Sequence, residues 1–301
     1  MFSRMIKKQI AKQEEKLERF LSRHEREVPF PDDVTLTADF PCLDGEEAIY
    51  TVDIFRPAGV EETLPVVLDI HGGGFLLGKK EVNRLFCADF CKRGFLVLSA
   101  EYPLAPRADI FSILRILSDL MRKIPEVSAE FGGDATRLFL VGDSAGAWLA
   151  LYLAAMQRSE RLAATAGVDL AGTPRVSALG LQSGMFYTQK FDSVGLFLPS
   201  LIYGKKFRAH PFFPYANPEH EEILTHLPPV FLVTGRGDFL RRYSRRYAKM
   251  LEKANADLCF LDKKDEKPLP HAFPAILPEL PVSGEANDAM ARFFRSKEAV
   301  N

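Results

Sequence analysis

The sequence predicts an α/β protein with a mostly parallel β-sheet that is covered by helices on both faces. Apolar runs of strand length alternate with helical patterns along most of the 301 residues, and this alternation is typical of parallel sheets. Two glycine-rich turns, at residues 71–75 and 142–146, each follow an apolar run directly. A stretch rich in aromatic residues and proline breaks the alternation at 184–228.

The individual elements follow from the hydrophobic period of each segment. Short apolar or alternating segments predict strands at 48–55, 64–70, 94–100, 137–141, 176–182, 230–234 and 258–261. Apolar residues at helical spacing predict helices at 82–92, 110–123, 144–157, 240–253 and 284–294, and an amphipathic helix at 4–26. Because strands and helices follow one another in turn, we expect successive strands to lie parallel.

These elements divide the chain into four parts. Residues 1–47 hold the N-terminal helix and a linker, 48–183 and 229–301 form the two parts of the α/β core, and 184–228 are inserted between them. The insertion includes Phe191, Phe197 and Tyr203 among many aromatic residues. With the N-terminal helix, it is a candidate cap over the carboxyl edge of the sheet. Most of its aromatic side chains are expected to form the cap's own core, and a few to contact substrate.

The composition excludes several classes of protein. With 47% hydrophobic and 26% charged residues and a net charge of −1, the chain has no overall attraction for nucleic acid or anionic membranes. It has no apolar stretch of transmembrane length and no signal-peptide core, so we expect a cytoplasmic protein without stable membrane insertion. The basic bias of the helix at 4–26 leaves a membrane-surface role open, although its interspersed glutamates favour packing on the protein's own body.

The four cysteines are too few and too scattered for a disulfide framework. Cys87 and Cys91 lie one helical turn apart without a second pair of ligands, which indicates buried thiols rather than half of a zinc site. The cysteines therefore indicate no zinc site, and the serine chemistry described below needs no cofactor.

The most informative motif is the pentapeptide Gly142-Asp143-Ser144-Ala145-Gly146, between a predicted strand and an alanine-rich helix. A serine in this position must lie on a sharp turn, and the flanking glycines let strand and helix approach closely. This is the pattern of a nucleophile elbow, which exposes the serine hydroxyl at a helix N-terminus. The motif predicts Ser144 as a catalytic nucleophile.

A second motif, His71-Gly72-Gly73-Gly74-Phe75, follows the predicted strand at 64–70. Consecutive glycines allow backbone N–H groups to point into a site, although such a turn alone could simply be flexible. Together with an elbow downstream it predicts an oxyanion hole formed by the N–H groups of Gly72, Gly73 and Ala145. His71 is expected to shape this loop rather than to act as a base.

A serine nucleophile also needs a general base and an acid that orients the base. His271 follows the last predicted strand and is the expected base, because the other histidines lie in the N-terminal helix, the glycine turn or the insertion. Asp238, where the strand at 230–234 meets a loop, is the expected acid, with an N-cap role as the alternative. Three other aspartates are less suitable as the acid: Asp257 precedes its strand, and Asp262 and Asp265 share the loop of His271. The order Ser144, Asp238, His271 is that of an α/β-hydrolase.

Together these motifs resemble the hormone-sensitive-lipase-like family of α/β-hydrolases. The resemblance also rests on Tyr102-Pro103-Leu104-Ala105-Pro106, Asp238-Phe239-Leu240-Arg241 and His271-Ala272-Phe273, and runs from about residue 48 to the C-terminus. It implies an α/β-hydrolase fold with an eight-stranded sheet and a helical cap. It also implies metal-free hydrolysis of short-chain carboxylic esters, and it leaves a homodimer possible.

Three residues depart from the family's usual pattern: Arg107 replaces a glutamate, Arg242 an aspartate and Trp148 an asparagine. They leave loop geometry and substrate preference open. An amidase or peptidase on the same triad remains an alternative, as does a non-catalytic protein that binds a small ligand. The expected partner is a small-molecule ester, and no nucleic acid.

Overall fold

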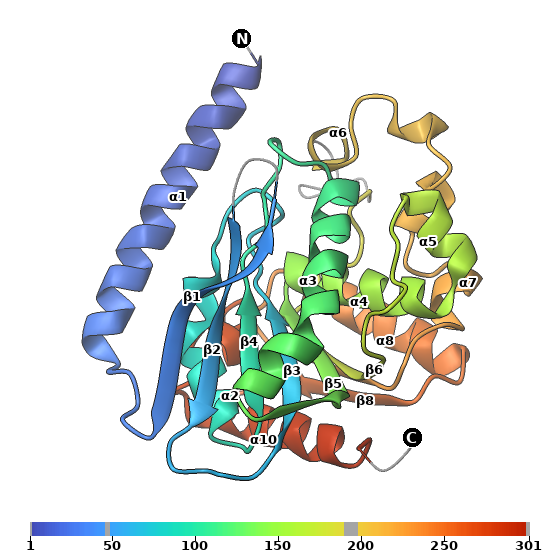
Figure 1. Cartoon of the computed structure of the whole chain (residues 1–301). Helices are drawn as coiled ribbons and strands as arrows, with labels where there is room; N and C mark the ends of the chain where they lie inside the picture. The colour runs from blue at the N-terminus through green and yellow to red at the C-terminus, as the bar shows by residue number, and fades with distance from the viewer. Residues whose placement is uncertain (1, 46–48, 190–197, 299–301) are drawn as a thin grey trace.

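An eight-stranded sheet forms the centre of the protein, whose computed structural model describes residues 2–45, 49–189 and 198–298 (Figure 1). The spatial order is β1-β2-β4-β3-β5-β6-β7-β8. The bounds are Val34–Asp44 (β1), Ile49–Pro57 (β2), Leu64–Ile70 (β3), Leu96–Ala100 (β4), Gly133–Asp143 (β5), Val176–Gln182 (β6), Val230–Gly235 (β7) and Leu258–Lys263 (β8). The β1–β2 and β2–β4 pairs are antiparallel and the other pairs parallel. The predicted mostly parallel, eight-stranded sheet is confirmed.

The edge strand β1 is not predicted by the sequence pattern. Val34 is its one buried residue, and its register with β2 shifts between Thr37 and Phe40 and again between Pro41 and Leu43. Bulges and proline are tolerated at a sheet edge, where a strand pairs on one side only. A strand of this kind needs no continuous apolar run, and the sequence shows none.

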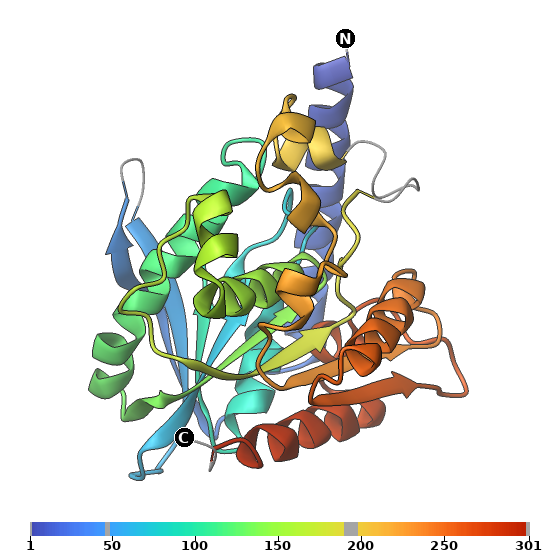
Figure 2. The same ribbon diagram turned by 90° about the vertical axis from the view of Figure 1, so that its right-hand side faces the viewer.

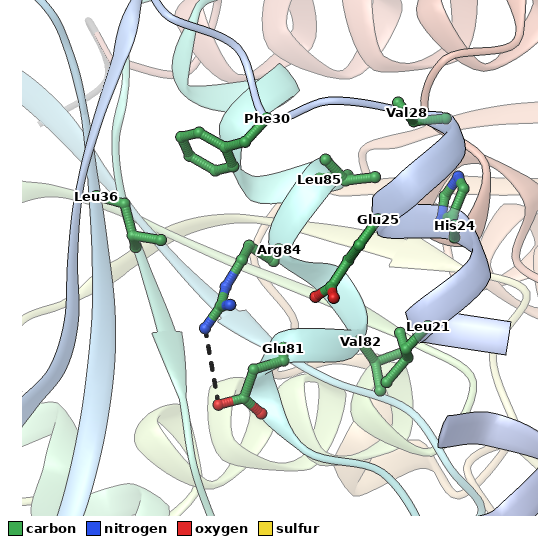
Figure 3. Close-up of a pocket in the computed structure, with 10 residues that line it drawn as sticks. All are labelled: Leu21, His24, Glu25, Val28, Phe30, Leu36, Glu81, Val82, Arg84 and Leu85. Atoms are coloured by element: carbon green, nitrogen blue, oxygen red, sulfur yellow. Dashed lines mark ion pairs between the residues drawn. The ribbon is translucent and has the colours of Figure 1, made fainter. Parts of the chain in front are cut away.

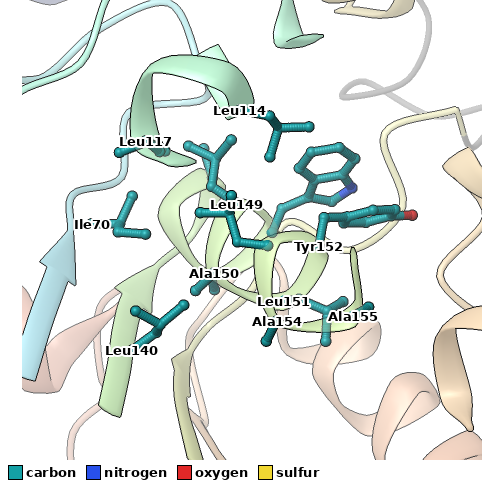
Figure 4. Close-up of a cluster of buried hydrophobic side chains, with 14 of the residues drawn as sticks. Ile70, Leu114, Leu117, Leu140, Leu149, Ala150, Leu151, Tyr152, Ala154 and Ala155 are labelled. Atoms are coloured by element: carbon teal, nitrogen blue, oxygen red, sulfur yellow. The ribbon is translucent and has the colours of Figure 1, made fainter. Parts of the chain in front are cut away.

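Helices cover both faces of the sheet, as predicted (Figures 1 and 2). Buried residues of α3, α4 and α8 share one core with the sheet, and those of α2 and α10 share the other. In the first core, Ile70 and Leu140 of the sheet lie near Leu149 of α4, with Leu114 and Leu117 of α3 beyond (Figure 4). The bounds are Arg84–Cys91 (α2), Ile110–Glu130 (α3), Ala145–Arg158 (α4), Glu160–Ala166 (α5), Arg241–Lys253 (α8), Phe273–Ile276 (α9) and Pro281–Arg295 (α10), with the 3₁₀ turn η1 at Lys80–Asn83.

The insertion after β6 packs against α4. It contains α6 (Leu198–Ile202), η2 (Phe207–Ala209), η3 (Phe213–Ala216) and α7 (Glu221–Leu224). Tyr152 of α4 donates its hydroxyl to the carbonyl of Tyr215 at 2.6 Å, and its ring contacts that of Phe212. Most of the insertion's described aromatic side chains are buried, whereas Phe191 and Phe197 lie outside the described residues.

The N-terminal helix α1 (Phe2–Glu27) packs on the body through its C-terminal half (Figure 1). Among residues 10–27, Leu21 and His24 are the buried ones, and residues 11–16 are exposed. A pocket of about 340 Å³ lies between its last turns, β1 and the η1–α2 segment, with Val82 and Leu85 in its lining (Figure 3). None of the helices in the described part of the chain has the length and apolar character needed to cross a membrane.

The start of α4 lies so close to the ends of β3 and β5 that glycine is required on both sides of Ser144. A Cβ atom at Gly146 would lie 1.8 Å from the carbonyl oxygen of Ile70 and 2.7 Å from that of His71. A Cβ atom at Gly142 would lie 2.4 Å from the carbonyl carbon of Gly146. The close approach expected from the sequence is therefore present, and it fixes α4 against the strand that leads into the glycine-rich loop.

A buried polar cluster joins the carboxyl ends of β3 and β5 to η1. The amide nitrogen of Asn83 donates to both oxygens of Asp69 (3.1 and 3.2 Å) and to Oδ1 of Asp143 (3.0 Å). The Ser99 hydroxyl donates to Asp69 at 3.0 Å. Burial, and then the neighbouring Asp143, raise the pKa of Asp69 to about 7, and burial also raises the pKa of Asp143. One amide thus holds two buried acidic groups together beside Ser144.

We predict that Gly146→Ala strongly destabilises the fold, because its Cβ would clash with the Ile70 carbonyl oxygen. Overpacking against backbone is expected to lower the free energy of unfolding by about 3 kcal/mol or more. The matched control is Gly284→Ala in α10, where a Cβ would meet nothing nearer than Arg93 Nη2 at 4.0 Å. There we expect a neutral effect or a gain of up to about 1 kcal/mol. Urea unfolding measures the free energy of unfolding of both variants and of the wild type. Equal values for Gly146→Ala and the wild type would contradict the close approach.

We predict that Asp69→Asn changes how stability depends on pH. The raised pKa means that the folded state keeps a proton which the unfolded state loses above about pH 4. Ionisation of Asp69 in the unfolded state favours unfolding, so the wild-type stability falls as pH rises from about 4 toward 7, whereas asparagine cannot ionise. Between about pH 5 and pH 8 the variant should gain about 2 kcal/mol relative to the wild type. The measurement is the free energy of unfolding as a function of pH, with the exposed Asp265→Asn as the control. Parallel curves for Asp69→Asn and the wild type would contradict this prediction.

Candidate active site

Ser144 lies on a strained turn between β5 and α4. Its φ of 51° and ψ of −111° lie outside the regions that a residue with a side chain normally occupies. Its N–H donates to the carbonyl of Gln182 at 2.9 Å, and its own carbonyl accepts from the N–H of Met185 at 2.8 Å. The last residue of β6 and the turn that follows it therefore hold the serine backbone on both sides.

The structure brings Asp238 and His271 together, as the sequence predicts. Asp238 follows β7 and His271 follows β8, and Oδ1 of Asp238 lies 2.7 Å from Nδ1 of His271. The hydroxyl of Thr234 donates to the other carboxylate oxygen at 2.8 Å, and the N–H of Leu240 donates to Oδ1 at 2.8 Å. The carboxylate is thus held from three sides, one of them the imidazole.

These hydrogen bonds keep Asp238 ionised. Burial alone would raise its pKa, but the hydrogen bond and charge of His271, then hydrogen bonds from Ser183 and Leu240, lower it below the ordinary value. An ionised Asp238 accepts a hydrogen bond from the Nδ1–H group of His271. In the neutral imidazole, Nε2 is therefore the nitrogen without a proton. Nε2 is buried and has no hydrogen-bond partner within the described part of the chain.

The residues after β6 connect this pair to Ser144. The N–H of Ser183 donates to the carbonyl of Val233 at 2.9 Å, and the hydroxyl of Ser183 accepts from the N–H of Ala272 at 3.1 Å. Two residues later, Met185 bonds to the carbonyl of Ser144. The structure places no hydrogen bond between the hydroxyl of Ser144 and His271, but it fixes both residues to one short segment.

The glycine-rich loop differs from expectation at Gly72, whose N–H donates to Oδ1 of Asp143 at 2.8 Å. This bond occupies the N–H and argues against Gly72 as an oxyanion donor. Among the described residues, the N–H groups of Gly73, Gly74 and Ala145 have no acceptor. Gly73 has φ of 112°, and a Cβ there would lie 1.9 Å from the carbonyl oxygen of Leu77, so glycine is required.

His71 shapes the glycine-rich loop and is not placed as a base. Its ring is fully buried and stacks on Tyr102 at 4.2 Å, whose hydroxyl donates to the His71 carbonyl at 2.6 Å. Nδ1 lies 2.8 Å from the carbonyl oxygen of Gly72. Burial lowers the pKa of His71 to about 4, so the ring is neutral near pH 7 and Nδ1 donates to that carbonyl.

The three residues that depart from the family pattern have different surroundings. Arg107 is exposed, and the guanidinium of Arg242 lies 5.4 Å from the ring centre of Tyr243. Trp148 is fully buried in α4. Of the three, the indole therefore contributes to the interior beside the site.

Sequence reasoning missed the supporting residues Asn83, Ser183 and Thr234. Nothing in the local sequence marks them, because each acts on a residue brought near by the sheet or by a turn. In the described ranges, no three His, Cys, Asp or Glu side chains are arranged to hold a metal ion.

Comparisons with known proteins agree with this architecture. A family model described as the α/β hydrolase fold matches residues 67–274. Carboxylesterase NlhH of Mycobacterium tuberculosis is 26% identical over 253 residues, which cover 78% of this chain and 74% of that protein. Esterase B from Lactobacillus rhamnosis, solved with a C4-C4 SN3 tributyrin phosphonate, has a TM-score of 0.88 at 24% identity and covers 98% of this chain and 95% of its own. An esterase from Pyrobaculum calidifontis has a TM-score of 0.74 at 23% identity, over 98% of this chain and 97% of its own. The chain belongs to the hormone-sensitive-lipase-like family of α/β-hydrolases.

Proposed function

We propose that this protein is a carboxylic ester hydrolase that cleaves short-chain esters through an acyl-enzyme on Ser144. The observation that carries the proposal is the 2.7 Å bond between Asp238 and His271, at the same sheet edge as the strained Ser144. The names of the relatives, a carboxylesterase and esterases, support the ester class.

In the first half-reaction, Ser144 Oγ attacks the ester carbonyl carbon while Nε2 of His271 accepts its proton. Asp238 keeps the proton on Nδ1 and stabilises the imidazolium that forms. The tetrahedral intermediate then collapses as His271 gives its proton to the leaving alcohol oxygen. The alcohol departs and the acyl group stays on Ser144.

In the second half-reaction, a water molecule takes the place of the alcohol. His271 accepts a proton from this water as its oxygen attacks the acyl carbon. Collapse of the second tetrahedral intermediate returns the proton to Ser144 Oγ and releases the carboxylic acid. The cycle uses the side chains already described and needs no cofactor.

The oxyanion that forms in each half-reaction would be bound by N–H groups of Gly73, Gly74 and Ala145. Gly73 and Ala145 were expected from the sequence, and Gly74 replaces Gly72, whose N–H is bonded to Asp143. A donor of this kind contributes about 3 kcal/mol to the transition state. The N-terminus of α4 adds its partial positive charge at Ala145.

The preference for short acyl groups is supported by the aromatic residues around α4. Trp148 and Tyr152 are fully buried there beneath the insertion, with Phe212 and Tyr215 beside them. Because Trp148, Tyr152 and Phe212 are fully buried, no space large enough for a water molecule borders them, and a long acyl chain would find no room among them. We propose a small-molecule ester as the substrate.

We predict that Ser144→Ala removes turnover without unfolding the protein, because a methyl group replaces the attacking hydroxyl. Initial rates on p-nitrophenyl esters from acetate to dodecanoate should peak at short chains in the wild type and fall by at least about 10⁴-fold in the variant. The control Ser296→Ala, at an exposed position at the end of α10 on the other face of the sheet, should keep the wild-type rates. Undiminished activity of Ser144→Ala would exclude the proposed nucleophile, and faster cleavage of matched anilides than of esters would favour an amidase.

A further inference from the structure

Trp148 is the only tryptophan of the chain, and it lies one helical turn after Ser144. The side chain is fully buried, and its Nε1 has no hydrogen-bond partner within the described residues. A buried donor without an acceptor costs about 1–3 kcal/mol. The indole therefore occupies this position at a cost that a phenylalanine would avoid.

The indole contacts three separate parts of the protein. It stacks on Tyr152 of the same helix at 3.8 Å between ring centres. Phe75, directly after the glycine-rich loop, packs edge-on against it at 5.6 Å, and Tyr203 of the insertion lies at 6.4 Å. Trp148 thus lies where the nucleophile helix, the glycine-rich loop and the insertion meet.

The neighbours of Trp148 are themselves held in place. Tyr203 stacks on Phe207 at 3.8 Å, and its hydroxyl lies 2.9 Å from that of Thr188. Tyr152 is fixed by its hydrogen bond to the carbonyl of Tyr215. Trp148, Tyr152 and Tyr203 therefore form a rigid wall of packed rings. Moving it would cost free energy, because several rings would have to change rotamer together.

The sheet order indicates which part of an ester would meet this wall. The leaving alcohol must face His271, which follows β8, because His271 protonates it. The glycine-rich loop follows β3, on the opposite side of β5. The carbonyl oxygen of an ester bound to Ser144 would face the N–H groups of that loop, and the alcohol would face His271. The acyl group then takes the third direction at the carbonyl carbon, toward the insertion, against which the indole packs at Tyr203.

We infer that Trp148 fills the space into which a longer acyl chain would extend, and so sets the length of acyl chain that Ser144 accepts. The inference rests on the proposed esterase function and names the residue that determines its specificity. The substrates that fit are esters of short carboxylic acids, and the alcohol part is not restricted by this residue.

The test compares Trp148→Ala with Trp148→Phe. The measured quantity is the ratio of kcat/KM for p-nitrophenyl octanoate to that for p-nitrophenyl butanoate. Removing the ring should raise this ratio about 10-fold or more, whereas phenylalanine, which keeps a wall, should change it by less than about threefold. Phe95→Leu is the matched control, because Phe95 is fully buried in the core on the other face of the sheet. This variant should lose stability and leave the ratio unchanged.

A second readout does not depend on the stability of a variant. Because the chain has one tryptophan, its fluorescence reports on this position alone. Stoichiometric labelling of the wild type with p-nitrophenyl butylphosphonate should shift or quench the emission. A folded Trp148→Ala protein with an unchanged ratio, or an unchanged emission after complete labelling, would overturn the inference and leave the proposed esterase intact. Absence of both labelling and ester turnover in the wild type would instead contradict the proposed function, and the inference with it.

Discussion

The rest of the site depends on one close approach, that of the N-terminus of α4 to the end of β3. Gly146 lies against the carbonyl oxygens of Ile70 and His71 with no room for a side chain. The hydrogen bond from the Gly72 N–H to Asp143 ties the same two elements together one residue further on. Together these contacts fix the serine turn and the glycine-rich loop relative to each other.

The polar residues around this contact serve to hold it rather than to react. Asp143 accepts from Gly72 and from Asn83, and Asn83 also binds Asp69. A buried carboxylate without such donors would be costly, so the cluster makes an acidic residue beside Ser144 tolerable. The result is that the Gly72 N–H is used for structure, which is why the proposed oxyanion donors are Gly73, Gly74 and Ala145.

Much of this arrangement could be predicted from the sequence, for identifiable reasons. The buried strands β3 and β5 carry continuous apolar runs, and the glycines beside Ser144 are a local signal of the close approach. The positions of Asp238 and His271 follow from counting strands, because parallel strands present their carboxyl ends at one edge.

Other features could not be predicted, since they depend on residues distant in the chain. The Gly72 N–H is occupied by a residue 71 positions later, which no local pattern reveals. Ser183, which follows β6, contacts Ala272, which follows β8, only because both strands lie next to β7. The edge strand β1 has no apolar period, because one of its sides lacks a partner. The departure at Trp148 was visible in the sequence, but its contacts with Phe75 and Tyr203 required the fold.

The central claim is that this geometry makes Ser144 the nucleophile. Its most direct test is to label the wild-type protein with a fluorophosphonate and to locate the adduct by peptide mass spectrometry. The account predicts one adduct per chain, on Ser144, although Ser183 nearby is also buried and has the same φ of 51°. An adduct on Ser183 or on any other residue, or labelling that persists in Ser144→Ala, would contradict it.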